Sequence, residues 1–234
     1  MVNKLVFCLL FVFLSSRQTK AQELAADQFG SDYKKAEQWL QTTAAHWDQM
    51  ALEGYNIPLA KAIIFPELLR YNQLRDKLEL FGLQVLYIQF GKDYADFSIG
   101  PFQMKPSFAE LIEQSGKNVS NNTTRKDRID LLNTTAGQFI YLRRFLQWMD
   151  KTYAGKPWHS MEEKIRFYAT AYNAGFNRPE KYLTAMLKRK YFRITEMSTD
   201  TFNYATIAFW YYQTRETSAN NQFVYLYGNN PFTP

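Results

Sequence analysis

Residues 62–72 read AIIFPELLRYN, an apolar run with a single acid, Glu67, behind it. A helix with this pattern buries its apolar residues, and burial disfavours the ionised form of a carboxyl group. Glu67 is therefore a candidate proton donor. Pro66 does not fit a helix interior, so we expect the helix to end or kink there, with Glu67 facing a cleft. The simpler interpretation is an ordinary carboxylate paired with Arg70 or Lys61.

Two further patterned stretches follow Glu67 along the chain. Residues 98–104 read SIGPFQM, and residues 171–175 read AYNAG. Gly100 permits a tight turn, and Gln103 and Asn173 each offer a donor and an acceptor. Such amides either bind a polar ligand or satisfy buried backbone groups, and the residue types alone leave both interpretations open.

The spacing of hydrophobic residues predicts a mainly helical chain. Helices are expected at residues 33–50, 59–65, 134–149, 160–174 and 199–212. Ser160 and Glu163 fit a capping box at the start of the fourth of these helices, and Gly175 fits its end.

The other segments carry weaker signals. Residues 85–90 fit a short strand or a helix equally well. Residues 115–128 are rich in Asn, Ser and Thr and are predicted to be a loop, and the polar tail from Thr217 is predicted to be irregular. No linker or repeat divides the chain, so we expect one domain over residues 22–234.

The first 21 residues are typical of a secretory signal peptide. Lys4 supplies the positive charge, residues 5–14 are an apolar run too short to span a bilayer, and small residues end the segment. A membrane anchor is the alternative. Cleavage would remove Cys8, the only cysteine, and would leave no disulfide and no cysteine metal site. His46 and His159 have no acidic partner at ligand spacing, so we expect no metal, and no motif indicates a cofactor.

The charge and composition of the chain limit the class of partner. The formal net charge of +6 falls to about +3 without the signal, whose three basic residues have no acid beside them. This mild excess suits an anionic polymer such as a cell-wall glycan. It does not indicate nucleic acid, because we find no dense basic block.

These motifs, in this order, resemble those of the lysozyme-like lytic transglycosylases, the soluble lytic transglycosylase and goose-type lysozyme superfamily. The family's catalytic Glu at an apolar helix end corresponds to Glu67, and its Gly-Leu-Met-Gln turn corresponds to residues 100–103. Its Ala-Tyr-Asn-Ala-Gly motif is present unchanged at residues 171–175. A fourth motif, with an acid, a Thr and a Tyr three residues later, corresponds to residues 200–204. The resemblance extends over about residues 56–212.

The resemblance implies a fold, an activity and a location. The fold would be a single lysozyme-like catalytic domain, mainly α with little β. The activity would be cleavage of the MurNAc-β-1,4-GlcNAc bond of peptidoglycan with formation of a 1,6-anhydro sugar, and Glu67 would act alone as general acid and then base. The protein would be exported to the periplasm or cell envelope of a bacterium. Partners would be glycan strands, with cell-envelope or secretion-apparatus proteins as further candidates, and the resemblance implies no nucleic acid and no transmembrane segment after signal removal.

The resemblance also implies which residues bind the substrate. They are Ser98, Gly100, Gln103, Tyr172, Asn173 and Tyr204. The two tyrosines are expected either to stack on a sugar or bond the acid, or to be plain core aromatics. Ser98 either bonds the substrate acetamido group or the acid, or merely starts the turn.

The chain departs from the family pattern in three places. Leu68 stands where the family usually has Ser, Pro101 and Phe102 replace Leu and Met, and the spacing from Glu67 to the turn indicates an insertion at about residues 74–94. Two alternatives therefore stay open. One is a lysozyme-type hydrolase in which Asp93 or Asp96 holds a water, and the other is a glycan-binding scaffold that has lost catalysis.

Overall fold

The computed structural model describes residues 29–71, 73–115, 123–194 and 200–227, with side chains described only outside 73–80 and 216–227. The chain is mainly helical, as the hydrophobic spacing predicts. Strand-like pairing in these residues is limited to two isolated bridges, Ile99 with Met104 and Phe192 with Phe202. The predicted signal peptide and Cys8 lie outside the described residues. No helix in the described part is both long and apolar enough to cross a membrane.

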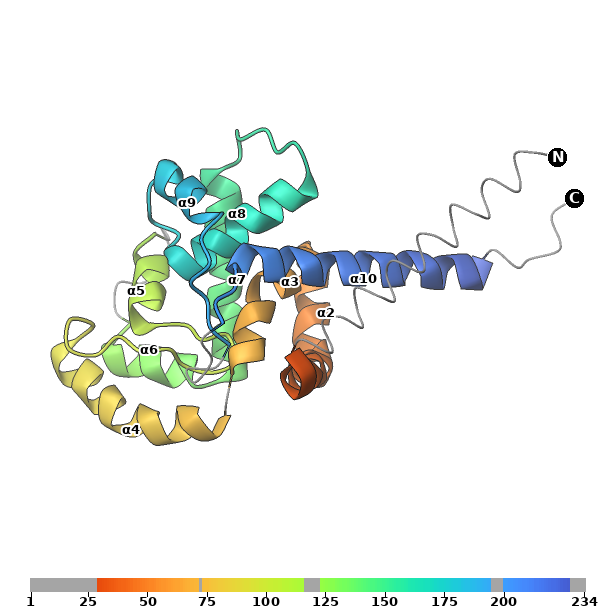
Figure 1. Cartoon of the computed structure of the whole chain (residues 1–234). Helices are drawn as coiled ribbons and strands as arrows, with labels where there is room; N and C mark the ends of the chain where they lie inside the picture. The colour runs from red at the N-terminus through yellow and green to blue at the C-terminus, as the bar shows by residue number, and fades with distance from the viewer. Residues whose placement is uncertain (1–28, 72, 116–122, 195–199, 228–234) are drawn as a thin grey trace, which may run out of the picture.

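A helix over residues 29–42 is followed by nine helices that Figure 1 labels. Their bounds are α2 Ala44–Leu52, α3 Ile57–Arg70, α4 Gln73–Phe90, α5 Pro106–Ser115, α6 Arg125–Leu132, α7 Thr135–Thr152, α8 Met161–Ala174, α9 Glu180–Met186 and α10 Tyr204–Tyr227.

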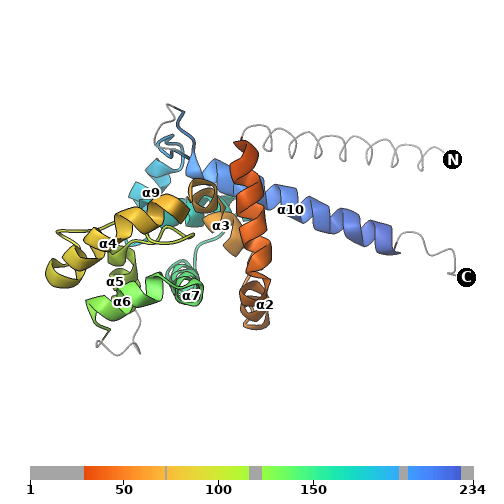
Figure 2. The ribbon, with the colours of Figure 1, turned by 90° about the horizontal axis from the view of Figure 1, so that it is seen from below.

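Helix α3 lies at the centre of the molecule. Its residues 59–69, apart from the half-buried Lys61, are all buried, and it packs against α2, α8 and α10. Figures 1 and 2 place α4, α5 and α6 on one side of α3, and α2 and the far half of α10 on the other. The buried apolar residues form a cluster to which nearly every helix contributes, and α3 supplies the largest share of it. The acid of the apolar run is thereby carried into the core.

Local capping explains where several helices begin and end. The Ser160 hydroxyl accepts from the Glu163 N–H at the start of α8, and Gly175, with φ +100°, ends that helix. The Thr134 hydroxyl accepts from the Gly137 N–H at the start of α7. These two helices confirm the predicted elements at residues 134–149 and 160–174, with α7 running three residues further.

Several predicted boundaries are wrong, each for a local reason. The expected single helix over residues 33–50 is interrupted at Thr43, whose hydroxyl donates to Trp39 O and accepts from the Trp47 ring N–H. The predicted loop at 115–128 gives way to α6 at Arg125, because Thr124 and Asp127 form a capping box.

The C-terminal part of the chain also departs from its prediction. Helix α10 begins at Tyr204 rather than at residue 199, because the Asn203 side chain caps it by accepting from the Thr206 N–H. The tail from Thr217, predicted to be irregular, continues as helix to Tyr227 and runs past the edge of the helical body in Figure 1.

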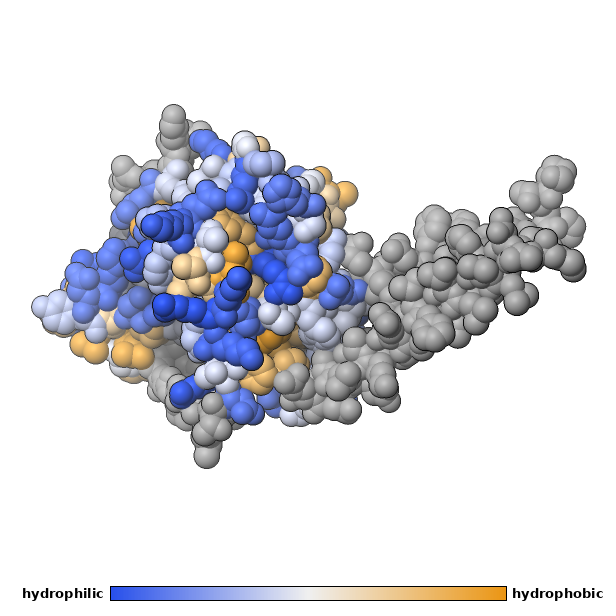
Figure 3. Space-filling view, turned by 45° about the horizontal axis from the view of Figure 1, so that its top comes forward, coloured by the Kyte–Doolittle hydropathy of each residue, from blue (hydrophilic) through white to orange (hydrophobic). Residues whose placement is uncertain are grey.

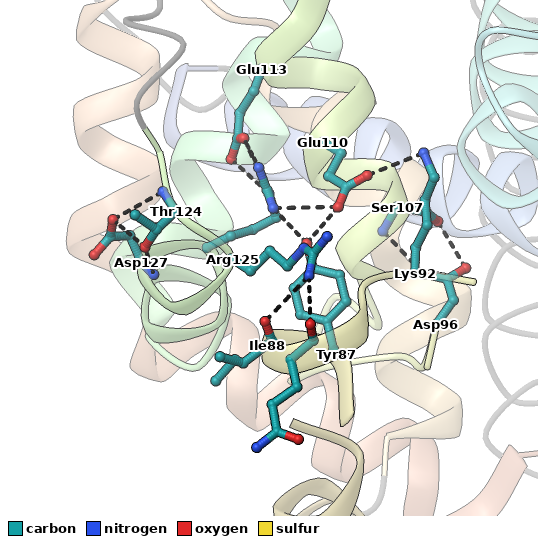
Figure 4. Close-up of polar contacts among 12 residues, drawn as sticks. Tyr87, Ile88, Lys92, Asp96, Ser107, Glu110, Glu113, Thr124, Arg125 and Asp127 are labelled. Carbon is teal, nitrogen blue, oxygen red and sulfur yellow. Dashed lines mark hydrogen bonds and ion pairs between the residues drawn. The ribbon is translucent and has the colours of Figure 1, made fainter. Parts of the chain in front are cut away.

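The segment interpreted as an insertion is a helix, which settles the choice between strand and helix for residues 85–90. Helix α4 is anchored by a buried polar network that joins it to α5, α6 and α7, and Figure 4 shows the part of this network that involves α4, α5 and α6. The Arg128 guanidinium donates to Glu113 and to the Tyr87 hydroxyl, and the Tyr141 hydroxyl donates to Glu113 at 2.6 Å. The Tyr87 hydroxyl donates in turn to Glu110 at 2.7 Å.

The outer face of α4 is less well covered. Phe81, Val85, Leu86 and Phe90 are exposed, as is Tyr94 just beyond the helix. The face of the molecule in Figure 3 is otherwise mostly hydrophilic, with hydrophobic residues at the surface in a few separate places.

Candidate functional site

Glu67 is a buried carboxyl group in the last turn of α3. Only 4 % of the residue is exposed. Of the two outcomes expected at Pro66, an end of the helix at Glu67 is wrong, because α3 continues to Arg70 with Pro66 inside it. Pro66 lacks the N–H that would bond the Ala62 carbonyl. Next to this gap, the Ile63 carbonyl accepts from the buried Tyr204 hydroxyl at 2.9 Å, so a tertiary contact holds α3 beside the interruption.

Burial raises the pKa of Glu67 to about 7. Arg70 acts in the opposite direction, since its Nη2 lies 2.8 Å from Glu67 Oε2. This pairing is the one that the simpler interpretation of the sequence proposed. Oε2 nevertheless has no hydrogen-bond partner of good geometry among the described residues, so we attribute the Arg70 effect to charge rather than to an aligned hydrogen bond. Desolvation outweighs the ion pair, so the Glu67 carboxyl keeps its proton to a higher pH than an ordinary glutamate does.

The turn at residues 100–103 is built around two left-handed positions. Gly100 has φ +65° and Gln103 has φ +49°. Gln103 folds back on the turn, with its backbone N–H and its Nε2 both donating to Gly100 O at 2.9 and 2.8 Å. This leaves Gln103 Oε1 as the group that can accept from a ligand.

Gln138, on α7, holds this turn in place by hydrogen bonds. Its Oε1 accepts from the Phe102 N–H at 2.9 Å, and its Nε2 donates to the carbonyls of Leu132 and Ile99 at 2.8 and 3.3 Å. A Cβ on Gly100 would lie 1.6 Å from Gln138 Nε2, so only glycine fits there. Sequence reasoning missed Gln138, because a glutamine inside an amphipathic helix looks like any surface residue.

The tyrosines of the two remaining motifs join the turn and α3 to the rest of the site. Tyr172 is 7 % exposed and its hydroxyl donates to Phe102 O at 2.7 Å, while Tyr204 is 2 % exposed and bonds α3. Burial, followed by the charge of Glu67, raises the pKa of both hydroxyls well above the ordinary value. Both therefore lie within electrostatic reach of the acid, and their geometry is that of positioning residues with hydroxyls already engaged.

Asn173 follows Tyr172 in the last turn of α8. Its Nδ2 is buried and has no hydrogen-bond partner among the described residues. A buried donor left unpaired costs about 1–3 kcal/mol, so this group indicates a binding function or a bound water. The Arg70 Nε beside the acid is in the same condition.

Ser98 is not brought into this arrangement by any contact. It is half-buried one residue before the Ile99 bridge, and no hydrogen bond joins it to Glu67 in the described part of the chain.

The two acids considered for holding a water, Asp93 and Asp96, are not placed to do so by any hydrogen bond to Glu67 among the described residues. Asp96 accepts from the Ser107 N–H and hydroxyl at 3.0 and 2.8 Å, at the start of α5, and Asp93 is exposed.

Sequence reasoning also missed a contact of Arg70, the arginine that pairs with Glu67. The Arg70 guanidinium lies over the Phe192 ring at 5.2 Å, and the Phe192 ring meets Tyr204 edge-on at 5.0 Å. The bridge between Phe192 and Phe202 fixes the ring in this place. Burial and the charges of Tyr182 and Glu67 raise the pKa of the neighbouring Tyr191.

The arrangement brings a carboxyl with a raised pKa, an amide donor without a partner among the described residues and a tightly held glycine turn into one region. Within the described residues, no group of three or more His, Cys, Asp or Glu side chains lies together as a metal site requires. The chain has no significant match among protein-family models, curated proteins or solved structures.

Proposed function

We propose that this protein is a peptidoglycan lytic transglycosylase with a lysozyme-like fold, exported to the periplasm or cell envelope of a bacterium. The observation that carries the proposal is Glu67: an acid in the most deeply buried helix, with a pKa raised to about 7 despite an adjacent arginine. Burial of an acid costs stability, and a general acid that has to hold a proton near neutral pH gives a functional reason for that cost.

The proposed reaction uses Glu67 twice. The protonated carboxyl donates its proton to the oxygen that links N-acetylmuramic acid to N-acetylglucosamine, and that bond breaks. The muramic acetamido group supports the developing positive charge. Glu67, now a carboxylate, takes the proton of the muramic C6 hydroxyl as this oxygen attacks C1 of the same sugar. The product is a 1,6-anhydro sugar, and no water is consumed.

A pKa of about 7 suits both halves of this cycle. A carboxyl near this value releases and regains a proton at neutral pH with little driving force lost in either direction. After the first proton transfer Glu67 is ionised, and the positive charge of Arg70 stabilises this carboxylate by offsetting part of the cost of its desolvation. Since the attacking hydroxyl belongs to the same sugar, holding the sugar in place supplies much of the rate.

The remaining site residues are assigned to holding the sugar. The unpaired Asn173 Nδ2 donates to the acetamido carbonyl, and Gln103 Oε1 accepts from an N–H or hydroxyl of the substrate. The Gly100 turn lets the sugar approach the backbone closely. Tyr172 and Tyr204 hold the turn and α3 at fixed positions around it.

The two alternatives have less support. A hydrolase needs a second carboxylate or a held water, and Asp96 is engaged at the start of α5 while Asp93 is exposed. A scaffold without catalysis does not require the raised pKa of Glu67, which the proposed general acid does require.

Digestion of purified sacculi, analysed by mass spectrometry, tests the proposal. The wild type is expected to release fragments that end in 1,6-anhydro-muramic acid, and Glu67→Gln is expected to release none. Glu162→Gln, which changes an exposed acid at the start of α8, serves as the matched control and should act as the wild type does. Fragments with reducing ends alone would establish the hydrolase, and glycan binding without release would establish the scaffold.

A further inference from the structure

One short segment carries a large net positive charge. Residues 178–193 contain six of the chain's 28 basic residues and one acid, a net charge of +5, whereas the whole chain carries +6. When residues 1–21, whose net charge is +3, and residues 178–193 are both left out, the remaining residues have a net charge of −2. The segment comprises α9 and the residues that lead to the Phe192 bridge.

In the described part of the chain, the segment's own acid does not neutralise its basic residues. Its one acid, Glu180, pairs with Lys156 at 2.6 Å, outside the segment. The consecutive residues Lys188, Arg189 and Lys190 are all exposed, as is Arg193. None of these four lies within ion-pair distance of an acid in the part of the chain that the structure describes. Uncompensated cations that face solvent attract anionic ligands.

The segment is fixed beside the candidate acid. The Asn203 Nδ2 donates to the carbonyls of Leu187 and Arg189 at 2.7 and 3.0 Å, which holds the backbone of the basic run. Two residues beyond this run, Phe192 lies under the Arg70 guanidinium, and Arg70 contacts Glu67. A polymer lying across Glu67 would therefore pass the cations of residues 188–193.

We propose that residues 188–193 bind the carboxylates of the peptide side chains that a muramic glycan carries, so that the site selects glycan with its peptides attached. This inference rests on the proposed function. The peptides branch from the muramic residues, one of which must lie at Glu67 when its bond breaks. Lysine and arginine pair with carboxylates, and several such pairs along one segment add affinity and orient the strand.

Binding measured apart from turnover tests the inference. Binding of full-length Glu67→Gln protein to intact sacculi would be measured by sedimentation. Binding to soluble glycan strands would be measured by equilibrium dialysis, after an amidase has removed the peptides and the lactyl carboxylates that this cleavage leaves have been converted to amides. Three charges are then neutralised together in this background, as Lys188→Gln, Arg189→Gln and Lys190→Gln. A control variant neutralises three exposed lysines elsewhere, Lys34, Lys126 and Lys151.

The basic-run variant is expected to bind intact sacculi about tenfold more weakly than the control variant at low salt, and the difference should vanish at about 0.5 M salt. On peptide-free glycan the two variants should bind equally. Equal binding to intact sacculi, or an equal loss on both glycans, would overturn the inference.

Two further readouts separate this inference from others. Tighter binding of the Glu67→Gln protein to a short DNA duplex than to polyglutamate, lost in the basic-run variant, would assign the segment to nucleic acid and overturn the inference. If the wild type releases anhydro ends from both glycans at equal rates, this inference fails while the proposed function stands. If it releases them from neither, the proposed function fails.

Discussion

Replacing Glu67 with glutamine is expected to stabilise the protein at alkaline pH. Burial raises the pKa of Glu67 from 4.5 to about 7, so the folded state holds the proton over a range in which the unfolded state has lost it. Stability therefore falls as pH rises from about 4.5 to about 7 and stays lower above that range. At 1.36 kcal/mol per pKa unit, the full cost to the folded protein is about 3 kcal/mol.

The glutamine variant keeps the shape of the side chain and removes this cost. It also removes the charge partner of Arg70, but the pKa of about 7 already includes the attraction between the two side chains, so that attraction is not subtracted a second time. Above pH 8 the variant should therefore exceed the wild type by about 3 kcal/mol. At pH 4.5 most of this advantage disappears, because both side chains are then neutral in the folded state.

Urea unfolding of both proteins at pH 4.5 and 8.5 measures this difference directly. The exposed Glu162→Gln variant is the control, and its stability should follow that of the wild type at both pH values. Equal pH dependence of the wild type and Glu67→Gln would show that the Glu67 carboxyl has an ordinary pKa in the folded protein. The general-acid assignment would then lose its physical basis.

Three other substitutions test the construction around the acid. Gly100→Ala should destabilise the protein by at least about 2 kcal/mol in urea unfolding, because the added Cβ meets Gln138 Nε2. A near-neutral change would contradict the close packing of Gln138 against the turn. Arg70→Met should raise the pKa of Glu67 further and move the alkaline limb of the pH–rate profile to higher pH, and a shift to lower pH would refute the assigned charge effect. Arg128→Met should cost about 3–5 kcal/mol in thermal or urea unfolding, because it leaves Glu113 buried without its ion pair.

The sequence predicted the elements whose signals are local. Helices α7 and α8 follow the apolar periodicity of the sequence. The residues just before them, Thr134 and Ser160, cap them by hydrogen bonds to backbone N–H groups three residues later. The burial of Glu67 followed in the same way from the apolar run around it. Such features depend on residues that are close together in the sequence, so they can be predicted from the sequence alone.

Features that depend on distant contacts could not be predicted. Pro66 fits inside α3 while Tyr204, 141 residues later, bonds the Ile63 carbonyl. The Gly100 turn depends on Gln138, whose contact with Phe102 crosses 36 residues. The pairing of Glu67 with Arg70 could be predicted from their i,i+3 spacing, but the resulting pKa of Glu67 could not. Only the burial of Glu67 in the structure shows that desolvation raises this pKa by more than the charge of Arg70 lowers it.

The protonation state of Glu67 is the claim on which the account depends most. It can be measured by carbon NMR of protein labelled at the glutamate carboxyl carbon, titrated from pH 3 to pH 9 with Glu67→Gln to assign the resonance. We predict one resonance with a midpoint near pH 7 that is absent from the variant. A Glu67 resonance with a midpoint below about pH 5 would contradict the account, because the carboxyl would then hold no proton to donate at neutral pH.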